Sequence, residues 1–260
     1  MKVSSDGLEL QVEAFGEGRP FLFAHSLGGC RHQVRRMLEP LAREFRIITF
    51  DQRGHCGSTP VTDPALYDPQ RMAADVGAVL DALGIAQAIV GGESMGAATT
   101  LLFATTNPKR VQHLVQVAPT VGDEPNPSEQ TIVAIADFAA KYGLDAAADA
   151  VALASMSLGI PREAAGLVTE IWIHHRLDSF VAANRAVPHW VLFEDLAPVA
   201  ALKVPVGVLA WGNDPSRPLP LARRLASAAR RGRIETVDSL AELARTPGLY
   251  AKLLRRLLPE

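Results

Sequence analysis

The sequence contains very little cysteine. Only Cys30 and Cys56 occur in 260 residues, and neither a CxxC pair nor a cysteine–histidine spacing typical of a zinc site is present. No dinucleotide-binding fingerprint is present either. We therefore expect no disulfide framework, no metal and no cofactor.

Long apolar runs and an excess of charge of one sign are also missing. No uninterrupted apolar run reaches the roughly 18 residues of a membrane helix, and the opening residues MKVSSDGLEL lack the apolar core of a signal peptide. The 26 basic residues are balanced by 28 acidic ones, which does not favour a nucleic-acid partner. We expect a cytoplasmic protein with a small-molecule substrate and without nucleic-acid or membrane partners. The composition does not indicate an oligomeric state.

The sequence does contain a regular alternation of apolar runs and helix-period patterns over its first 118 residues. Short links separate these elements, as in a parallel sheet with helices on both faces. The expected strands span residues 8–15, 21–25, 45–50, 88–92 and 111–118, and the expected helices 33–43, 70–83 and 95–106.

This alternation stops at mid-chain and resumes later. Residues 120–198 contain helical stretches rich in alanine and leucine, and none of them has the pattern of a buried strand. The later strands are expected at 204–211 and 233–237, and the later helices at 219–229 and up to the C-terminus. The sequence thus predicts an α/β core of residues 1–119 and 199–260, with a helical cap insertion of residues 120–198.

Ser94 lies in the stretch VGGESMG, between an expected strand and an expected helix. Gly92 to Gly96 fit the pattern G-x-S-x-G, in which a sharp strand-to-helix turn holds the serine in a strained conformation. The flanking small residues relieve the clash, and the hydroxyl projects above the carboxyl edge of the sheet, where ligands bind. Ser94 is therefore the predicted nucleophile.

Two further stretches accompany this turn, and together the three resemble the α/β-hydrolase family over essentially the whole chain. HSLGG, residues 25–29, stands where the family has its oxyanion loop. DQRGHCGS, residues 51–58, is similar to the family's D-x-R-G-x-G-x-S turn. The resemblance implies an α/β-hydrolase fold, with a mostly parallel central sheet between two layers of helices.

The resemblance also implies roles for individual residues. The backbone N–H groups of Leu27 and Met95 are expected to face a developing oxyanion. His25 and Ser26 belong to the same oxyanion loop, in which the His25 side chain is expected to brace neighbouring turns. Cys56 departs from the family pattern, because glycine is usual at its position.

The family's triad follows the order serine, acid, histidine, and only the first two are found here. Asp214, after the run VPVGVLAWGN, occupies the position of the acid. The histidine position falls on Leu240 when the following proline is matched, and none of the seven histidines lies beyond His189. A second candidate position, in DPSRP, holds Arg217. A triad of Ser94, Asp214 and a later histidine is therefore impossible.

One interpretation keeps serine chemistry and finds another base. A serine hydroxyl is a poor nucleophile without one, and the insertion contains three histidines that could reach Ser94. His189, in AVPHWVLF, is the preferred candidate, and His174 and His175 come next. Asp123, which follows the last strand before the insertion, would then supply the acid.

Two other interpretations do without nucleophilic attack. The protein could be a non-hydrolytic lyase or cyclase, in which Ser94 donates a hydrogen bond and an unpaired, partly buried Asp214 moves protons. It could also be a non-catalytic ligand-binding member of the family.

The insertion indicates an apolar substrate, because it is rich in alanine, leucine and valine. The oxyanion loop and short cap look most like the enol-lactonase and antibiotic-methylesterase branch of the family. We therefore favour a hydrolase of the esterase or lactonase type that acts on a small to medium apolar ester or lactone.

Overall fold

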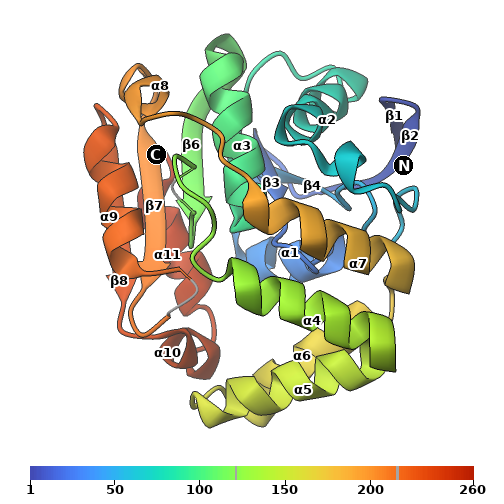
Figure 1. The fold of residues 1–260 in the computed structure, drawn as a ribbon. Helices are drawn as coiled ribbons and strands as arrows, with labels where there is room; N and C mark the ends of the chain where they lie inside the picture. The colour runs from blue at the N-terminus through green and yellow to red at the C-terminus, as the bar shows by residue number, and fades with distance from the viewer. Residues whose placement is uncertain (121, 215–216) are drawn as a thin grey trace.

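The computed structural model describes residues 1–120, 122–214 and 217–260 and is centred on one eight-stranded sheet (Figure 1). The strands are β1 (Lys2–Ser5), β2 (Leu8–Phe15), β3 (Arg19–Ala24), β4 (Phe45–Phe50), β5 (Ala88–Glu93), β6 (Val111–Val117), β7 (Val206–Trp211) and β8 (Gly232–Val237). Their order is β1-β2-β4-β3-β5-β6-β7-β8. β2 pairs antiparallel with β1 and β4, and the other pairings are parallel. The predicted, mostly parallel sheet is confirmed.

Alternating side chains build a separate hydrophobic core on each face of the sheet. In β3, Leu22 and Ala24 join one buried cluster, whereas Phe21 and Phe23 join the other. The first cluster is covered by α2 (Pro69–Ala82), α3 (Met95–Thr106) and α9 (Leu219–Ala228), and the second by α1 (Arg31–Leu38) and α11 (Leu249–Leu257). Burial on both faces explains why the central strands read as continuous apolar runs.

The segment between β6 and β7 is helical. Its helices are α4 (Glu129–Tyr142), α5 (Leu144–Ser157), α6 (Arg162–Trp172), α7 (Leu177–Ala186) and α8 (Ala197–Ala200), with a 3₁₀ turn at Val187–His189. α4 packs against α7 and α5 against α6. We call α4 to α7 the insertion helices, and Figure 1 shows them gathered at the lower right. Within the described ranges, no helix is long and apolar enough to cross a membrane.

Three differences from the predicted elements have local causes. β1 was not expected, and its four residues are held by antiparallel pairing with β2. The helix expected to reach residue 43 ends at Leu38, because Pro40 follows within a 3₁₀ turn at Glu39–Leu41. The last helix is split into α10 (Leu240–Arg245) and α11, since Gly248 between them adopts a left-handed φ of 77°.

Candidate active site

Ser94 occupies a strained turn between β5 and α3. Its φ of 51° and ψ of −111° lie in a region that residues with a side chain rarely adopt. The turn is held by two backbone hydrogen bonds, from Ser94 N to the Val117 carbonyl at 3.0 Å and from Ala98 N to the Ser94 carbonyl at 3.0 Å. A Cβ atom at Gly92 would overlap the Gly96 backbone, and one at Gly96 would overlap the carbonyl of Ala24. The G-x-S-x-G pattern therefore follows from steric need.

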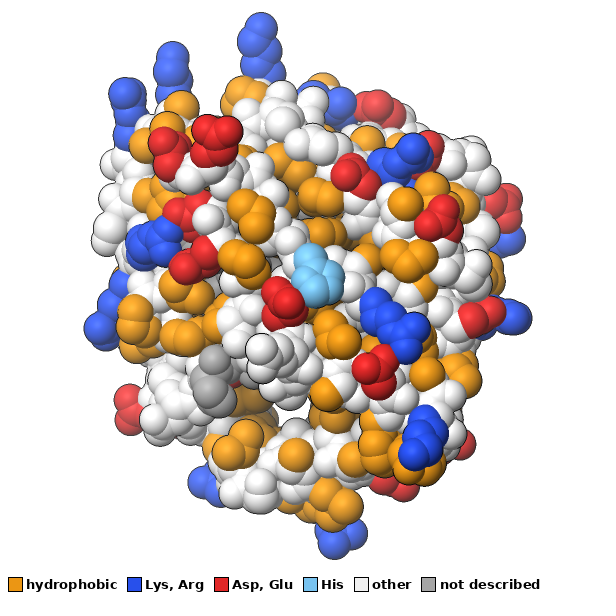
Figure 2. Space-filling view, viewed as in Figure 1, with side chains coloured by type: hydrophobic (Ala, Val, Ile, Leu, Met, Phe, Trp, Pro, Cys, Tyr) orange, Lys and Arg blue, Asp and Glu red, His pale blue; other side chains and the backbone are white. Residues whose placement is uncertain are grey.

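Ser94 opens into a cavity of about 340 Å³ between the sheet edge and the insertion helices. The insertion helices contribute an apolar part of the wall, including Ile132, Ile135, Val168, Ile171 and Trp172, and polar or charged side chains line the rest together with Leu27 and two glycines. Figure 2 shows a hollow bordered by hydrophobic side chains on the face where these helices lie. A smaller hollow of about 40 Å³ adjoins Ser94 and is lined by Met95, Thr120 and Trp190 among others.

The loop of residues 25–29 forms another wall of this cavity, through Ser26, Leu27, Gly28 and Gly29. His25 braces it, as predicted for its side chain: Gln52 N donates to His25 Nε2 at 2.9 Å, and Gln52 Nε2 donates to the His25 carbonyl at 2.7 Å. Within the described ranges, the Leu27 N–H donates no hydrogen bond to another protein group. The Met95 N–H is the first of α3 and has no intrahelical acceptor. Neither N–H group is therefore engaged by another described protein group.

Asp214 is paired, contrary to the expectation of an unpaired carboxylate. Trp211 Nε1 donates to Asp214 Oδ2 at 2.8 Å, and Arg217 Nε donates to the same oxygen at 3.0 Å. The Arg217 backbone N–H donates to Oδ1 at 3.3 Å. The Asp214 carboxylate is thus hydrogen-bonded by an indole and a guanidinium, whereas in a triad its partner would be an imidazole.

Arg217 also connects the acid to the cavity. Its Nη1 lies 4.0 Å from Glu93 Oε1, and both Arg217 and Glu93 line the cavity beside Ser94. Burial raises the pKa of the Glu93 carboxyl, although the charge of Arg217 opposes the rise. We call Asp214, Arg217 and Glu93 the charged row. It holds two carboxyl groups on either side of one permanent cation.

The candidate histidines of the insertion lie elsewhere. His189 Nδ1 is 3.2 Å from Glu129 Oε1, and the side chain is 55% exposed. His175 is buried against His55 and Cys56, and His174 lines a different cavity. Among the described residues, no imidazole lines the Ser94 cavity. The candidate acid Asp123 pairs with Arg224.

Glu93 and Arg217 were missed as parts of the site. Both stood in motifs that the sequence had singled out, Glu93 inside G-E-S-M-G and Arg217 at the end of the acid turn. The sequence feature that could have identified them is a charged residue in each of two motifs that the fold brings to the same edge of the sheet. No group of three or more histidine, cysteine, aspartate or glutamate side chains suited to a metal occurs in the described ranges.

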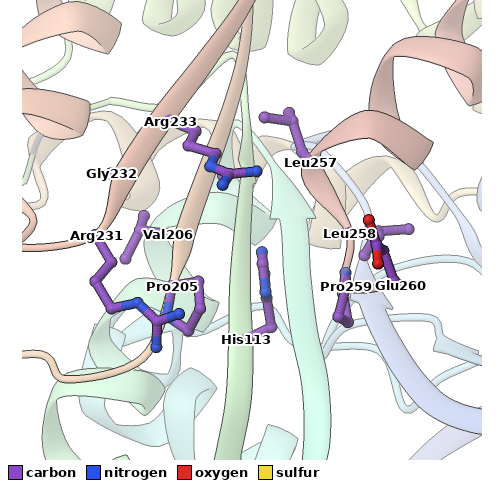
Figure 3. A pocket seen from close by; sticks show the side chains of 11 residues that line it. His113, Pro205, Val206, Arg231, Gly232, Arg233, Leu257, Leu258, Pro259 and Glu260 are labelled. Carbon is purple, nitrogen blue, oxygen red and sulfur yellow. The ribbon is translucent and has the colours of Figure 1, made fainter.

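A second cavity, of about 440 Å³, lies at the opposite edge of the sheet (Figure 3). It is lined by His113 near the start of β6, by Val206 and Gly232 at the starts of β7 and β8, and by Arg231 and Arg233. Burial lowers the pKa of His113 to about 4, and the two arginines add to the effect. Ligands of parallel sheets bind at the carboxyl ends of the strands, which favours the Ser94 cavity as the functional one.

Comparison with known proteins agrees with this fold. A family model described as alpha/beta hydrolase fold matches residues 19–203. The structure is similar to the enol-lactonase from Burkholderia xenovorans LB400, with a TM-score of 0.85, 22% identity and full coverage of both chains. It is also similar to a thermophilic esterase from Thermogutta terrifontis, with a TM-score of 0.81, 19% identity and 99% and 98% coverage.

Curated relatives match a shorter segment. An epoxide hydrolase of Caballeronia sordidicola is 31% identical over 109 residues, which is 42% of this chain and 33% of the relative. A putative non-heme haloperoxidase of Mycobacterium phage D29 is 34% identical over 125 residues, or 47% and 44% of the two chains. The matches thus span less than half the length of these relatives.

Proposed function

Because the chain belongs to the α/β-hydrolase family, we propose that it is a hydrolase that attacks a small to medium apolar ester or lactone through Ser94. The observation that carries this proposal is the strained Ser94 turn, with a φ of 51°, at the wall of a cavity of about 340 Å³. Backbone strain of this kind costs about 1 to 3 kcal/mol and persists mainly at functional sites. A cavity of this volume suits a small ligand.

The backbone N–H groups of Leu27 and Met95 are the proposed oxyanion donors. Both residues belong to the walls around Ser94, and each such donor lowers the barrier of acyl transfer by roughly 3 to 4 kcal/mol. Residues 120–198 would act as a cap over this site, because the insertion helices contribute most of its apolar wall. That wall supports an apolar acyl or lactone group as substrate.

The proposed reaction also requires a proton acceptor for Ser94. Glu93 is the carboxyl group that lines the Ser94 cavity, and burial raises its pKa toward the range useful for a general base. His189 is the acceptor that the sequence favours. Val187 and Pro188 of the same 3₁₀ turn line the smaller hollow, but the His189 side chain would have to leave Glu129 and turn inward to reach Ser94. We therefore place Glu93 ahead of His189.

The charged row favours a second candidate, a non-hydrolytic lyase or cyclase. Arg217 offers a permanent cation to an enolate or a leaving carboxylate, and Glu93 offers a titratable carboxyl in the same cavity. In that reaction Ser94 would donate a hydrogen bond and form no covalent intermediate.

Labelling with a fluorophosphonate and turnover of short p-nitrophenyl esters test the first proposal. We expect the wild type to be labelled and to turn over the esters, and Ser94→Ala to lose both activities. Ser157→Ala is the control, because Ser157 is exposed at the end of α5 and the variant should keep the label. A wild type that is not labelled by the fluorophosphonate and does not turn over the esters would contradict the hydrolase proposal. Turnover of enolate-forming substrates would then distinguish a lyase from a binding protein.

A further inference from the structure

Gln33 of α1 holds a buried carboxamide oxygen, Oε1, that has no hydrogen-bond partner among the described residues. Three carboxamide side chains line the Ser94 cavity, and the other two are engaged with the backbone. Asn126 Oδ1 accepts a backbone N–H at 2.8 Å, and Asn184 Nδ2 donates to a backbone carbonyl at 2.8 Å. A buried acceptor without a donor is unfavourable, so Gln33 points to a ligand group that supplies the missing donor.

The fold holds this oxygen against the loop of residues 25–29. A Cβ at Gly29 would lie 2.6 Å from Gln33 Oε1 and 3.2 Å from Ser26 Oγ, so glycine at this position leaves room for the carboxamide. Gly29 is two residues from Leu27, whose backbone N–H is a proposed oxyanion donor, and two residues span at most about 7 Å. A group bound by Gln33 would therefore lie close to the scissile carbonyl.

Another cavity begins at Gln33, between α1 and α6. It has a volume of about 560 Å³, and we call it the α1–α6 cavity. Gln33 and Ile171 line both this cavity and the Ser94 cavity, so the two cavities meet at these side chains. The wall of the α1–α6 cavity combines apolar side chains, such as Met37 and Leu167, with polar and charged ones.

We propose that the substrate of the Ser94 site is an ester or lactone with an acylamino group on the carbon next to the scissile carbonyl, and that Gln33 binds the N–H of this group. This proposal rests on the proposed hydrolase function and adds the chemical class of the substrate. A hydroxyl on the same carbon would also donate to Oε1, but it carries no further chain. An amide continues into an acyl chain, which the α1–α6 cavity has the volume to hold.

Gln33 acts in this proposal as a specificity-determining residue. It binds beside the reacting atoms and leaves the attack on the carbonyl to Ser94. A site built to hydrogen-bond a substrate N–H rejects the analogue that lacks it, because the buried acceptor is then left unpaired. If the carboxamide is rotated by half a turn, Nε2 takes the place of Oε1 and donates to the acyl carbonyl of the same group. Either orientation therefore favours an amide.

Binding to Ser94→Ala tests the proposal without chemistry at the serine. The probes are N-hexanoylglycine methyl ester and methyl nonanoate, which has the same chain length without the amide, and calorimetry measures both affinities. We expect the acylamino ester to bind more tightly, and Gln33→Met in the same background to lower the ratio of the two affinities by at least about tenfold. Gln70→Met is the matched control, because Gln70 is exposed at the start of α2, and it should keep the ratio.

Equal ratios in Ser94→Ala with and without Gln33→Met would overturn the proposal, because the carboxamide would then not contact the amide. Tighter binding of the corresponding 2-hydroxy ester than of the acylamino ester would overturn it too. If Gln33→Met does not fold, the comparison in Ser94→Ala alone decides, and weaker binding of the acylamino ester overturns the proposal. Failure of the hydrolase proposal shows separately, as loss of fluorophosphonate labelling in the wild type.

Leu167→Trp tests where the acyl chain lies. Leu167 lines the α1–α6 cavity and not the Ser94 cavity, so an indole there would take up space for the chain. We expect the gain in affinity from N-acetylglycine methyl ester to the N-hexanoyl compound to fall by at least about fivefold. Leu153→Trp is the control, because Leu153 of α5 is 64% exposed. An undiminished gain in Leu167→Trp, or in Met37→Trp if the first variant does not fold, would overturn this placement.

Discussion

The amino-terminal and carboxyl-terminal halves of the proposed active site differ in how closely they follow the family pattern. In the amino-terminal half, Ser94 lies in the strained turn that the sequence predicts, and the His25 side chain braces the 25–29 loop. At the carboxyl-terminal half, Leu240 stands at the histidine position and starts a surface helix, and Arg217 holds the acid. Backbone donors are positioned by strand register and steric contact, whereas a proton acceptor is a single side chain. One half can therefore change while the other is kept.

Gly96→Ala is the strongest test of the amino-terminal half. The new Cβ would overlap the Ala24 carbonyl, so β3 and α3 must separate, and we expect a loss of more than about 4 kcal/mol in the free energy of unfolding. Denaturant unfolding followed by circular dichroism measures it.

Gly166→Ala is the matched control, because a Cβ at this position in α6 would meet nothing within 4 Å. Alanine should raise stability by about 0.5 to 1 kcal/mol through helix propensity. Equal effects of the two substitutions would show that the steric argument for the Ser94 turn is wrong.

The charged row is tested by Arg217→Met. The substitution leaves the Glu93 and Asp214 carboxyls, whose side chains are 14% and 9% exposed, without their shared cation. We expect a loss of about 3 kcal/mol in the free energy of unfolding at pH 7, and a smaller loss at pH 4, because burial raises the pKa of the Glu93 carboxyl and so favours its neutral form as the pH falls. Urea titrations at the two pH values measure the difference.

Arg223→Met serves as the control for that experiment. Arg223 is exposed on α9, and it makes no ion pair with any described residue. Its removal should change stability by less than about 0.5 kcal/mol. A similar cost for both arginines would mean that the charged row is not a stabilising unit.

The contrast between the halves also explains what the sequence could predict. Gly92, Ser94 and Gly96 were predictable because their constraints act within one turn. The pairing of Glu93 with Arg217 was not, since it depends on bringing the end of β5 next to the loop after β7, across the intervening β6. For the same reason the expectation of an unpaired Asp214 was wrong: its partners are set by the fold of the loop that follows β7.

Glu93→Gln removes the proposed general base with almost no change of shape. We expect ester turnover to fall by about 100-fold. In the wild type, kcat/KM should decline as pH falls through the raised pKa of Glu93, and this acidic limb should disappear in the variant. The exposed Glu170→Gln should keep the wild-type profile.

The pH dependence of folding stability gives an independent test of the raised pKa of Glu93. Because its pKa is raised in the folded state by burial, the unfolded chain binds fewer protons between the ordinary and the raised pKa. Stability should therefore fall as pH rises through that window, and the Gln variant should lack this fall. Ionisation of Tyr250 does not contribute to the pH dependence of stability in this window, because burial raises the pKa of its phenol well above the usual value.

The smallest effect is expected for His189→Ala. The imidazole is 55% exposed and paired with Glu129, and it lines neither cavity beside Ser94. Its removal should therefore change ester turnover by less than about twofold, because exposed positions away from the site have small effects. Steady-state kinetics at pH 7 on His189→Ala and on Glu93→Gln make the comparison. A loss at His189 that equals or exceeds the loss at Glu93 would restore the insertion histidine as the base.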